Sequence, residues 1–147
     1  MDVLHDFNSI EVRYLSEEKV IALEFKKHSK SEEFRGAWNK ALELAIEHKA
    51  TRWLMDQRNQ SIFPEDQKWV ETDWFPRSME AIPLRVETPR YVAIVPSKNF
   101  FVEFSAKKFM KENSMPGFLI KPHQDVESAK EWLKNPELDE ELASLAS

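Results

Sequence analysis

The chain has 147 residues and a net charge of −5, and its composition excludes several classes of protein before any motif is considered. Hydrophobic residues make up 41% of it, with ten Phe and five Trp, which favours a packed core and argues against global disorder. There are no cysteines, so disulfides, thiol nucleophiles and Cys-ligated zinc are excluded.

Further exclusions concern targeting, membranes and nucleotides. The N-terminus has neither the basic start nor the apolar core of a signal peptide, and no apolar run approaches the roughly 20 residues of a membrane helix. The acidic charge balance would repel nucleic acid. The only glycines, Gly36 and Gly117, lie in no phosphate-binding pattern, so we expect no Rossmann or P-loop site. These observations predict a cytoplasmic domain with no membrane span, no nucleic-acid partner and no cofactor.

The first predicted elements are a strand hairpin and a helix. Apolar residues alternate with polar ones over 10–14, and a second apolar run covers 20–25, which favours two antiparallel strands. A helical stretch follows over 29–49, capped by Ser29 or Ser31 and with Glu32 and Glu33 at the positive end of its dipole. Its predicted inner face carries Phe34, Trp38, Ala41, Leu42 and Ala45.

The rest of the chain alternates strands with helices. We expect strands over 51–56, 91–95 and 117–120, because these are short, nearly continuous apolar runs. Helices are predicted over 64–75, ended or kinked by Pro76, over 98–112, capped by Ser97, and over 126–134, capped by Asp125 and stopped by Pro136. The acidic tail, 135–147, is expected to be mobile or only loosely docked.

The predicted fold class is therefore α/β, with the order β-β-α-β-α-β-α-β-α. Alternating strands and helices favour right-handed crossovers and a mostly parallel sheet. Here the sheet is mixed and five-stranded, because the first hairpin adds one antiparallel strand. We expect a single domain over residues 1–134, with helices flanking the sheet.

This order, together with three short motifs, resembles the STAS-like group. The motifs are Asp-x-Arg at Asp56 to Arg58 after a strand, PEDQKW at 64–69 followed by DWFPR at 73–77, and AKEWL at 129–133. The group includes the anti-sigma-factor antagonists, and the chain is most similar to its small stand-alone proteins, labelled SpoIIAA-like. The resemblance covers about residues 10–134. It implies a mixed sheet flanked by helices and a regulatory or binding role without an established reaction.

One departure from that group concerns the phosphorylation switch. Phosphorylated members carry the acceptor serine in a context like Asp-Ser-Ser-Gly-Leu at the start of the corresponding helix. Here Ser61 is followed by no glycine, and Glu65 and Asp66 lie close by. A phosphate on Ser61 would meet like charge, with Arg58 as the obvious counter-charge. The phosphoswitch mechanism is therefore not expected to apply.

The carboxyl ends of the predicted strands form one candidate site. Open α/β sheets bind ligands beyond these ends, where helix N-termini favour anions. If the second to fifth strands are parallel, an anion or small-molecule site could form there. Its candidate residues are Lys27, His28, Asp56, Arg58, Ser97, Lys98 and His123. The alternative is that this edge is an ordinary polar loop region.

The charged residues of 56–66 have both structural and chemical interpretations. Asp56 and Arg58 can pair with each other, or Arg58 with Asp66, and we expect the pair to fix the loop. Glu65 and Asp66 could act as acid–base groups or metal ligands. Their position in a first helical turn is explained more simply by the helix dipole, with Asp66 as a capping-box group.

Histidine and serine positions give no support to metal binding or nucleophilic catalysis. His5, His28, His48 and His123 have no HxxxH or HxH spacing, so no metal site is predicted. The serines near helix starts suit capping, and none lies in a GxSxG motif.

The aromatic residues suggest a binding surface. Trp69 and Trp74 are about 140° apart on a helix at roughly 100° per residue, so they cannot both point into the core. The predicted helix over 98–112 also carries aromatic residues all around it, namely Phe100, Phe101, Phe104 and Phe109. Such an apolar patch mediates homodimer formation, binding of a protein partner or binding of an apolar ligand in a pocket, and we favour a homodimer or partner surface over a pocket.

Three functions follow from the sequence, in order of preference. The first is a non-enzymatic regulatory or protein-interaction module of STAS-like type, with no catalytic residue. Its hypothetical partner- or ligand-binding residues are Asp56, Arg58, Ser61, Glu65, Asp66, Trp69 and Trp74. The second is a carrier or sensor of a small apolar or anionic ligand. The third is an enzyme that uses Asp56, Arg58, Glu65 and Asp66.

Overall fold

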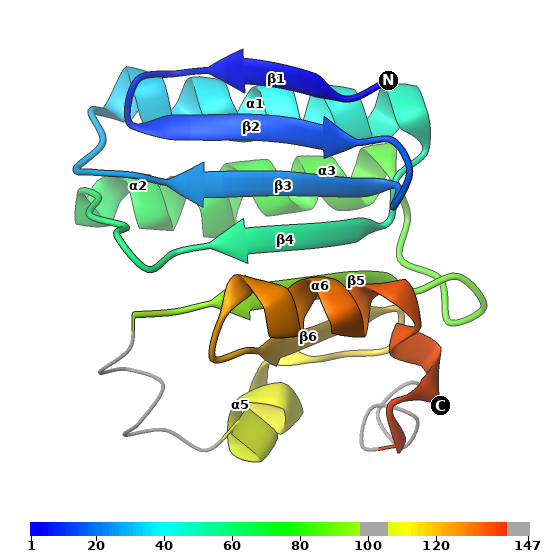
Figure 1. Ribbon diagram of the computed structural model, residues 1–147. Helices are drawn as coiled ribbons and strands as arrows, with labels where there is room; N and C mark the ends of the chain where they lie inside the picture. Colours follow the sequence, from blue (N-terminus) through cyan, green and yellow to red (C-terminus); the bar gives the residue numbers. More distant parts are fainter. Residues whose placement is uncertain (98–105, 141–147) are drawn as a thin grey trace. The chain divides into compact units, whose positions relative to one another are not determined.

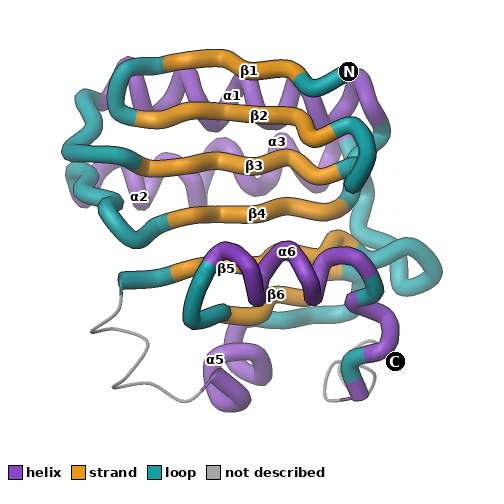
Figure 2. Tube along the Cα trace, in the orientation of Figure 1, coloured by secondary structure: helices purple, strands orange, loops and turns teal. Residues whose placement is uncertain are grey.

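A computed structural model of the chain describes residues 1–97 and 106–140, and its fold class is α/β, as predicted (Figures 1 and 2). The chain divides into two compact units. The first comprises residues 1–50 and 59–83, and the second comprises residues 51–58 and 84–147. Whether they form the single domain expected over 1–134 stays a prediction.

The first unit contains three antiparallel strands and two helical segments. Its elements are β1 (Val3–Asp6), β2 (Ile10–Leu15), β3 (Val20–Phe25), α1 (Ser31–His48), and the helical run α2 (Pro64–Trp69), η1 (Val70–Trp74) and α3 (Phe75–Ala81). Strand β2 pairs with both β1 and β3, and α1 packs against β2 and β3. Its core includes Ile10, Val12, Tyr14, Leu23, Phe25, Phe34, Ala37 and Ala41.

The prediction of five strands was wrong by one, because β1 precedes the first predicted strand. Along β1 the side chains alternate between half-buried and exposed, and none is fully buried. Its four residues therefore lack the apolar alternation that marks β2. The turn between the strands places Asn8 at a φ of 72°, a conformation that asparagine adopts more readily than most residues. Antiparallel pairing is consequently more extensive than a single hairpin.

The helix predicted over 64–75 continues to Ala81, so Pro76 does not end it. Proline has no N–H, and its ring collides with the carbonyl four residues earlier in a regular α-helix. Here residues Val70–Trp74 form a π-helical turn, in which the N–H of Phe75 donates to the carbonyl of Val70, five residues back. The wider turn lies directly before Pro76, and the helix continues beyond it.

The second unit contains three parallel strands and two helices. Its elements are β4 (Arg52–Asp56), β5 (Arg90–Val95), α5 (Ala106–Asn113), β6 (Phe118–Pro122), α6 (Val126–Lys134) and the short 3-10 helix η2 (Pro136–Leu138). Strand β5 pairs in parallel with β4 on one side and β6 on the other. Helix α6 packs over β5 and β4, and α5 contacts β6. Residues 98–105 of the helix predicted over 98–112 lie outside the described residues.

Two predicted helix starts have different outcomes. Asp125 caps α6, because its carboxylate accepts the N–H of Ser128 at 2.8 Å. Neither Ser29 nor Ser31 caps α1, whose N-cap is Lys30. The carboxylate of Glu33 accepts the N–H of Lys30 there, which satisfies one free donor of the first turn.

The beginning of the acidic tail is docked rather than loose. Pro136 is buried, and the Asp139 carboxylate accepts hydrogen bonds from Lys121 Nζ at 2.6 Å and Trp132 Nε1 at 3.0 Å. Charge pairing with Lys121 holds the segment after α6 against β6, which the sequence composition alone did not indicate. Residues 141–147 of the predicted tail lie outside the described residues.

Candidate functional site

The predicted binding residues of 56–74 belong to two units. Asp56 and Arg58 lie at the end of β4 in the second unit, whereas Ser61, Glu65, Asp66, Trp69 and Trp74 belong to the first. A carboxylate site shared by Asp56, Glu65 and Asp66 therefore stays a prediction.

Asp56 and Arg58 form the ion pair expected from the sequence. The Nε and Nη2 groups of Arg58 donate to the two carboxylate oxygens of Asp56 at 2.9 and 2.7 Å, and the Arg58 N–H adds a bond of 3.3 Å. Asp56 is buried, with 7% of its surface exposed, whereas Arg58 is exposed. This bidentate pair fixes the backbone where the chain leaves β4.

Asp66 has a structural role different from the one predicted. Its carboxylate is fully buried and accepts the hydroxyl of Ser31 at 2.7 Å and Nε of Arg35 at 2.9 Å. Both donors come from α1, so Asp66 attaches α2 to α1 instead of closing a capping box on its own helix. A buried carboxylate with two such partners is not available to a ligand.

The two tryptophans of this helix lie in different environments, as their angular separation predicted. Trp74 is buried, its Nε1 donates to the carbonyl of Trp38 at 2.8 Å, and the two rings meet edge to face. Trp69 is only half-buried. The guanidinium carbons of Arg35 and Arg77 lie 5.2 and 5.7 Å from the centroid of its ring. These are cation–π distances, so the ring is held between groups from α1 and α3.

Arg77 is itself fixed by polar partners. Its Nε donates to Asp73 at 2.9 Å, and its Nη2 donates to the side-chain carbonyl of Asn39 on α1 at 2.9 Å. Each guanidinium that contacts Trp69 is therefore also hydrogen-bonded to a carboxylate. We call Trp69, Arg35 and Arg77 the Trp69 clamp. It is a rigid, partly exposed aromatic–arginine surface.

Two residues of the Trp69 clamp, Trp69 and Arg77, lie on the same helical run as an exposed aromatic residue. Phe63, the N-cap of α2, has 40% of its surface exposed, and Glu65 in the first turn is exposed as well. Of the other aromatic residues proposed for a binding patch, Phe109 is half-buried on α5. Phe100, Phe101 and Phe104 lie outside the described residues.

Ser61 and His28 form a contact that the sequence did not reveal. His28 Nδ1 and Ser61 Oγ share a hydrogen bond of 2.8 Å, and both residues are exposed. They are 33 positions apart, with no motif around either. Only the folding of residues 59–63 beside the end of β3 brings them together.

The proposed anion site is only partly described. Ser97 and His123 follow β5 and β6 in the second unit, Lys27 and His28 belong to the first unit, and Lys98 lies outside the described residues. A site shared by all of them stays a prediction.

His123 is poorly suited to binding an anion by charge. It is 5% exposed, and burial is the main cause that lowers its pKa to about 4, with Lys121 adding to the effect. Its imidazole is therefore neutral near pH 7. Its Nδ1 shares a hydrogen bond with Ser128 Oγ at 3.2 Å, and its ring packs against Trp132. Its Nε2 is buried and has no partner among the described residues.

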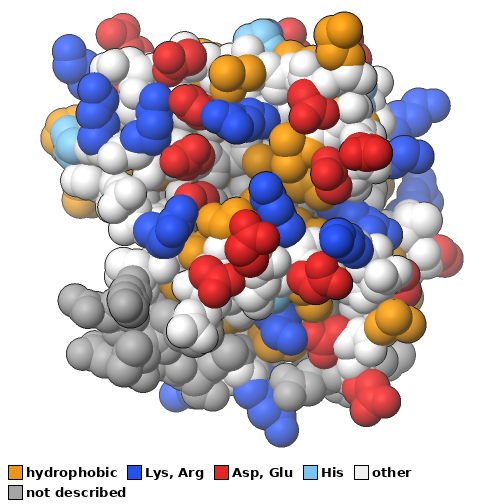
Figure 3. Space-filling model, viewed as in Figure 1, with side chains coloured by type: hydrophobic (Ala, Val, Ile, Leu, Met, Phe, Trp, Pro, Cys, Tyr) orange, Lys and Arg blue, Asp and Glu red, His pale blue; other side chains and the backbone are white. Residues whose placement is uncertain are grey.

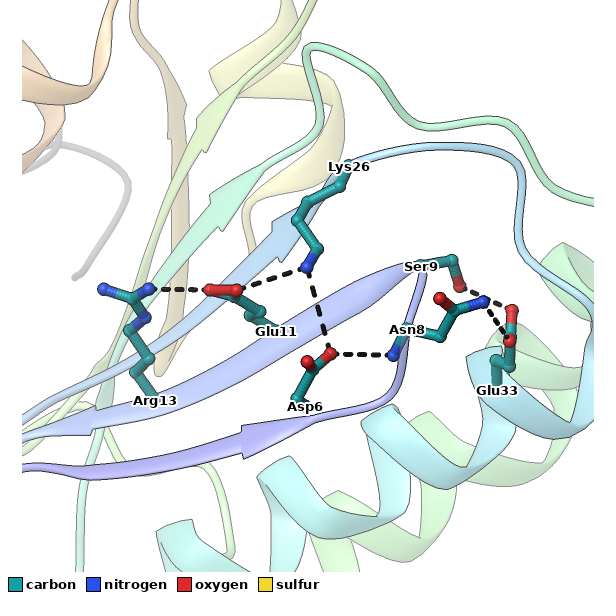
Figure 4. Close-up of polar contacts among 7 residues, drawn as sticks. All are labelled: Asp6, Asn8, Ser9, Glu11, Arg13, Lys26 and Glu33. Carbon is teal, nitrogen blue, oxygen red and sulfur yellow. Dashed lines mark hydrogen bonds and ion pairs between the residues drawn. The ribbon is translucent and has the colours of Figure 1, made fainter.

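The outer face of β1 to β3, opposite α1, carries both acidic and basic side chains, and these form ion pairs with one another (Figures 3 and 4). The Glu11 carboxylate accepts Arg13 at 2.6 Å and Lys26 at 3.2 Å, and Lys26 also lies 3.8 Å from Asp6. The Arg13 bond, followed by the Lys26 bond, lowers the pKa of Glu11. This face is a solvated network of paired charges and offers no single-sign patch for a charged partner.

A further polar contact fixes the β1–β2 turn on α1. The Glu33 carboxylate accepts the side-chain amide of Asn8 and the hydroxyl of Ser9, each at 2.9 Å (Figure 4). These bonds, that of Asn8 first, lower the pKa of Glu33. Glu33 thus serves the fold at both the turn and the helix start.

Neither a metal cluster nor a membrane helix occurs in the described part of the chain. Over residues 1–97 and 106–140, no three His, Asp or Glu side chains gather closely enough to hold a metal ion. Within the same residues no helix combines the length and apolarity needed to cross a membrane.

Comparisons with protein-family models, curated proteins and solved structures found no match to this chain.

Proposed function

We propose that the chain is a non-enzymatic, STAS-like protein-interaction module that binds its partner through the Trp69 clamp. The observation that carries this proposal is the different placement of two tryptophans on one helical run. Trp74 fills the core, whereas Trp69 is half-buried between two fixed guanidiniums. A rigid ring flanked by arginines loses little conformational freedom on binding, and Trp and Arg are enriched among residues that dominate interface energies.

The partner proposed first is a second copy of the chain. The helical run from Phe63 to Arg77 carries exposed Phe63 and two members of the Trp69 clamp, Trp69 and Arg77, and Arg35 joins them from α1, so a two-fold contact could bury these side chains. The resemblance to a group of regulatory binding proteins supports a protein partner over a reaction. The sequence-based expectation of a homodimer is thereby assigned to a defined surface.

Sedimentation velocity at micromolar concentration tests this proposal. We expect the wild-type chain to sediment as a dimer and Trp69→Ala to sediment as a folded monomer. Glu71→Ala is the matched control, because Glu71 is exposed on the same helical run and lies outside the Trp69 clamp. A wild-type monomer, or a Trp69→Ala variant that dimerises like wild type, would contradict self-association through this surface.

A second candidate function, a carrier or sensor of a small ligand, is favoured by His123. The register places Asp56 beside Val95 on β5, and His123 follows β6 next to the same residue. Side-chain alternation puts all three on the face that α6 covers, at the carboxyl ends of parallel strands. The buried Nε2 of His123 could bind a neutral polar ligand there. Native mass spectrometry would detect such a ligand as a small mass, absent from His123→Phe.

A further inference from the structure

In the contact between His28 and Ser61, a hydroxyl that can act as a nucleophile is paired with an imidazole that can act as a base. Their hydrogen bond, 2.8 Å between Nδ1 and Oγ, is within the range over which a general base removes a hydroxyl proton. Both residues are exposed, so an acyl donor in solution can reach the serine oxygen. The pair lies outside the Trp69 clamp, although His28 contacts Phe63, which the proposed interface includes.

The pair is held in place by backbone and ring contacts. The backbones of His28 and Ser61 form an isolated parallel bridge, and the N–H of Ser29 donates to the Ser61 carbonyl at 2.9 Å. The rings of His28 and Phe63 pack edge to face, with 4.8 Å between their centroids. Because both backbones and the imidazole ring are fixed, the two reacting atoms keep their relation without a ligand.

We propose that Ser61 is a nucleophilic acyl acceptor, with His28 as its general base. The reactive tautomer carries the proton on Nε2, so that Nδ1 accepts the proton of Ser61 Oγ–H. The oxygen then forms a bond to the carbonyl carbon of an activated acyl donor, of the thioester or aryl ester class. The bond from that carbon to the thiolate or phenolate breaks, and the leaving group takes up the proton from His28.

The expected product is an acyl-serine that accumulates. No carboxylate of the described residues contacts His28, whose partners there are Ser61 and Phe63. The imidazolium is thus not stabilised as it is in a Ser-His-Asp triad, and fast hydrolysis of the ester is not expected. Acylation would place an apolar group beside exposed Phe63, at the start of α2. Ser61 is therefore a modification site rather than the centre of a rapid enzyme.

The test uses p-nitrophenyl acetate as the acyl donor and peptide mass spectrometry to locate the label. Ser128 is an internal control, because it is also exposed and bonded to a histidine Nδ1, at 3.2 Å. Its partner His123 is buried with a pKa lowered to about 4 and is a weak proton acceptor. We expect Ser61 to be acetylated at least about tenfold faster than Ser128. Hydroxylamine should release the serine ester and leave lysine amides intact.

His28→Gln should slow acetylation of Ser61 at least about tenfold, because general-base catalysis contributes at least that factor. His5→Gln serves as the matched histidine control and should keep the wild-type rate. Equal labelling of Ser61 and Ser128 in the unmodified protein would overturn the proposal without any variant. Label confined to lysines, or an unchanged Ser61 rate in folded His28→Gln, would overturn it equally.

Discussion

At the scale of single residues, the pairing of charged groups decides which side chains are free to act. Asp56, Asp66 and Asp139 each lie in the interior or at its margin, and each accepts bonds from a cationic side chain. These carboxylates fix loops and helices to neighbouring elements. The exposed and half-buried groups that remain, among them Trp69 and Ser61, are the ones to which we assign binding and reactivity.

Arg58→Ala is expected to destabilise the protein by about 1–2 kcal/mol, because it leaves the buried carboxylate of Asp56 without its bidentate partner. Half of the Arg58 side chain is exposed, which keeps the loss below that of a fully buried pair. Urea denaturation measures the change, and Lys134→Ala, which removes the exposed ion pair with Glu131, is the control. Wild-type stability in Arg58→Ala combined with loss of a bound ligand would make this pair a chemical site.

His123 predicts a specific dependence of stability on pH. Burial lowers its pKa in the folded state to about 4, whereas an unfolded histidine titrates near 6.5. Between these values the unfolded state binds a proton that the folded state does not, so the free energy of unfolding falls as the pH is lowered. The loss should approach about 3 kcal/mol at pH 4.

Urea denaturation between pH 7.5 and 4 tests this dependence in the wild-type protein and in His123→Gln, which lacks the titrating ring. The variant should lose less stability over that range. Equal slopes would show that other groups control acid sensitivity.

At the scale of elements, side-chain patterns predicted most strands and helices but not their exceptions. The alternation at Ile10, Val12 and Tyr14 and the apolar run of β4 each reflect burial, so strands β2 to β6 lie where they were expected. Strand β1 was not predicted, because its side chains are at most half-buried and show no apolar alternation. The helix continues past Pro76 through a π-helical turn, and the residue pattern did not predict this turn.

The candidate site could be predicted only where its partners are close in sequence. Asp56 and Arg58 are two positions apart, and their pairing followed from the chain order. Arg35 on α1 and Trp69 on α2 meet only through the fold, and so do His28 and Ser61. Asp66 was interpreted as a helix cap because its true partners, Ser31 and Arg35, are remote in sequence.

The turn that leads into β6 gives a prediction at this scale. Gly117 has a φ of 82°, and a Cβ added there would lie 2.8 Å from the backbone nitrogen of Arg85. Gly117→Ala should therefore destabilise the protein by about 1–3 kcal/mol, as expected for a strained left-handed residue. Gly36→Ala is the control, since it lies within α1 and its Cβ would meet the Phe7 side chain at 3.2 Å. Equal thermal stability of the two variants would contradict this account.

The helical run that carries both Trp69 and Trp74 gives another prediction at the scale of elements. Trp74→Ala should cost about 3–5 kcal/mol, because it removes a buried ring and the bond to the Trp38 carbonyl. Trp69→Ala should cost about 1 kcal/mol, the magnitude of exposed cation–π contacts. Thermal unfolding of the two variants compares them. If Trp69→Ala is the more damaging change, Trp69 belongs to the core and its proposed binding role loses its basis.

At the scale of the whole molecule, each unit contains different groups to which we assign a role. The first unit contributes the Trp69 clamp and the Ser61–His28 pair, and the second contributes the buried His123 at the ends of its parallel strands. The resemblance to the STAS-like group stays a prediction.

Native mass spectrometry of the chain purified from its own cells tests the proposed binding function most directly, with wild-type, Trp69→Ala and Glu71→Ala proteins compared under the same conditions. We predict that wild type and Glu71→Ala carry a bound protein, a second copy or another chain, and that Trp69→Ala carries none while remaining folded. A wild-type chain that is found alone, or with only a small molecule bound, would contradict the proposal.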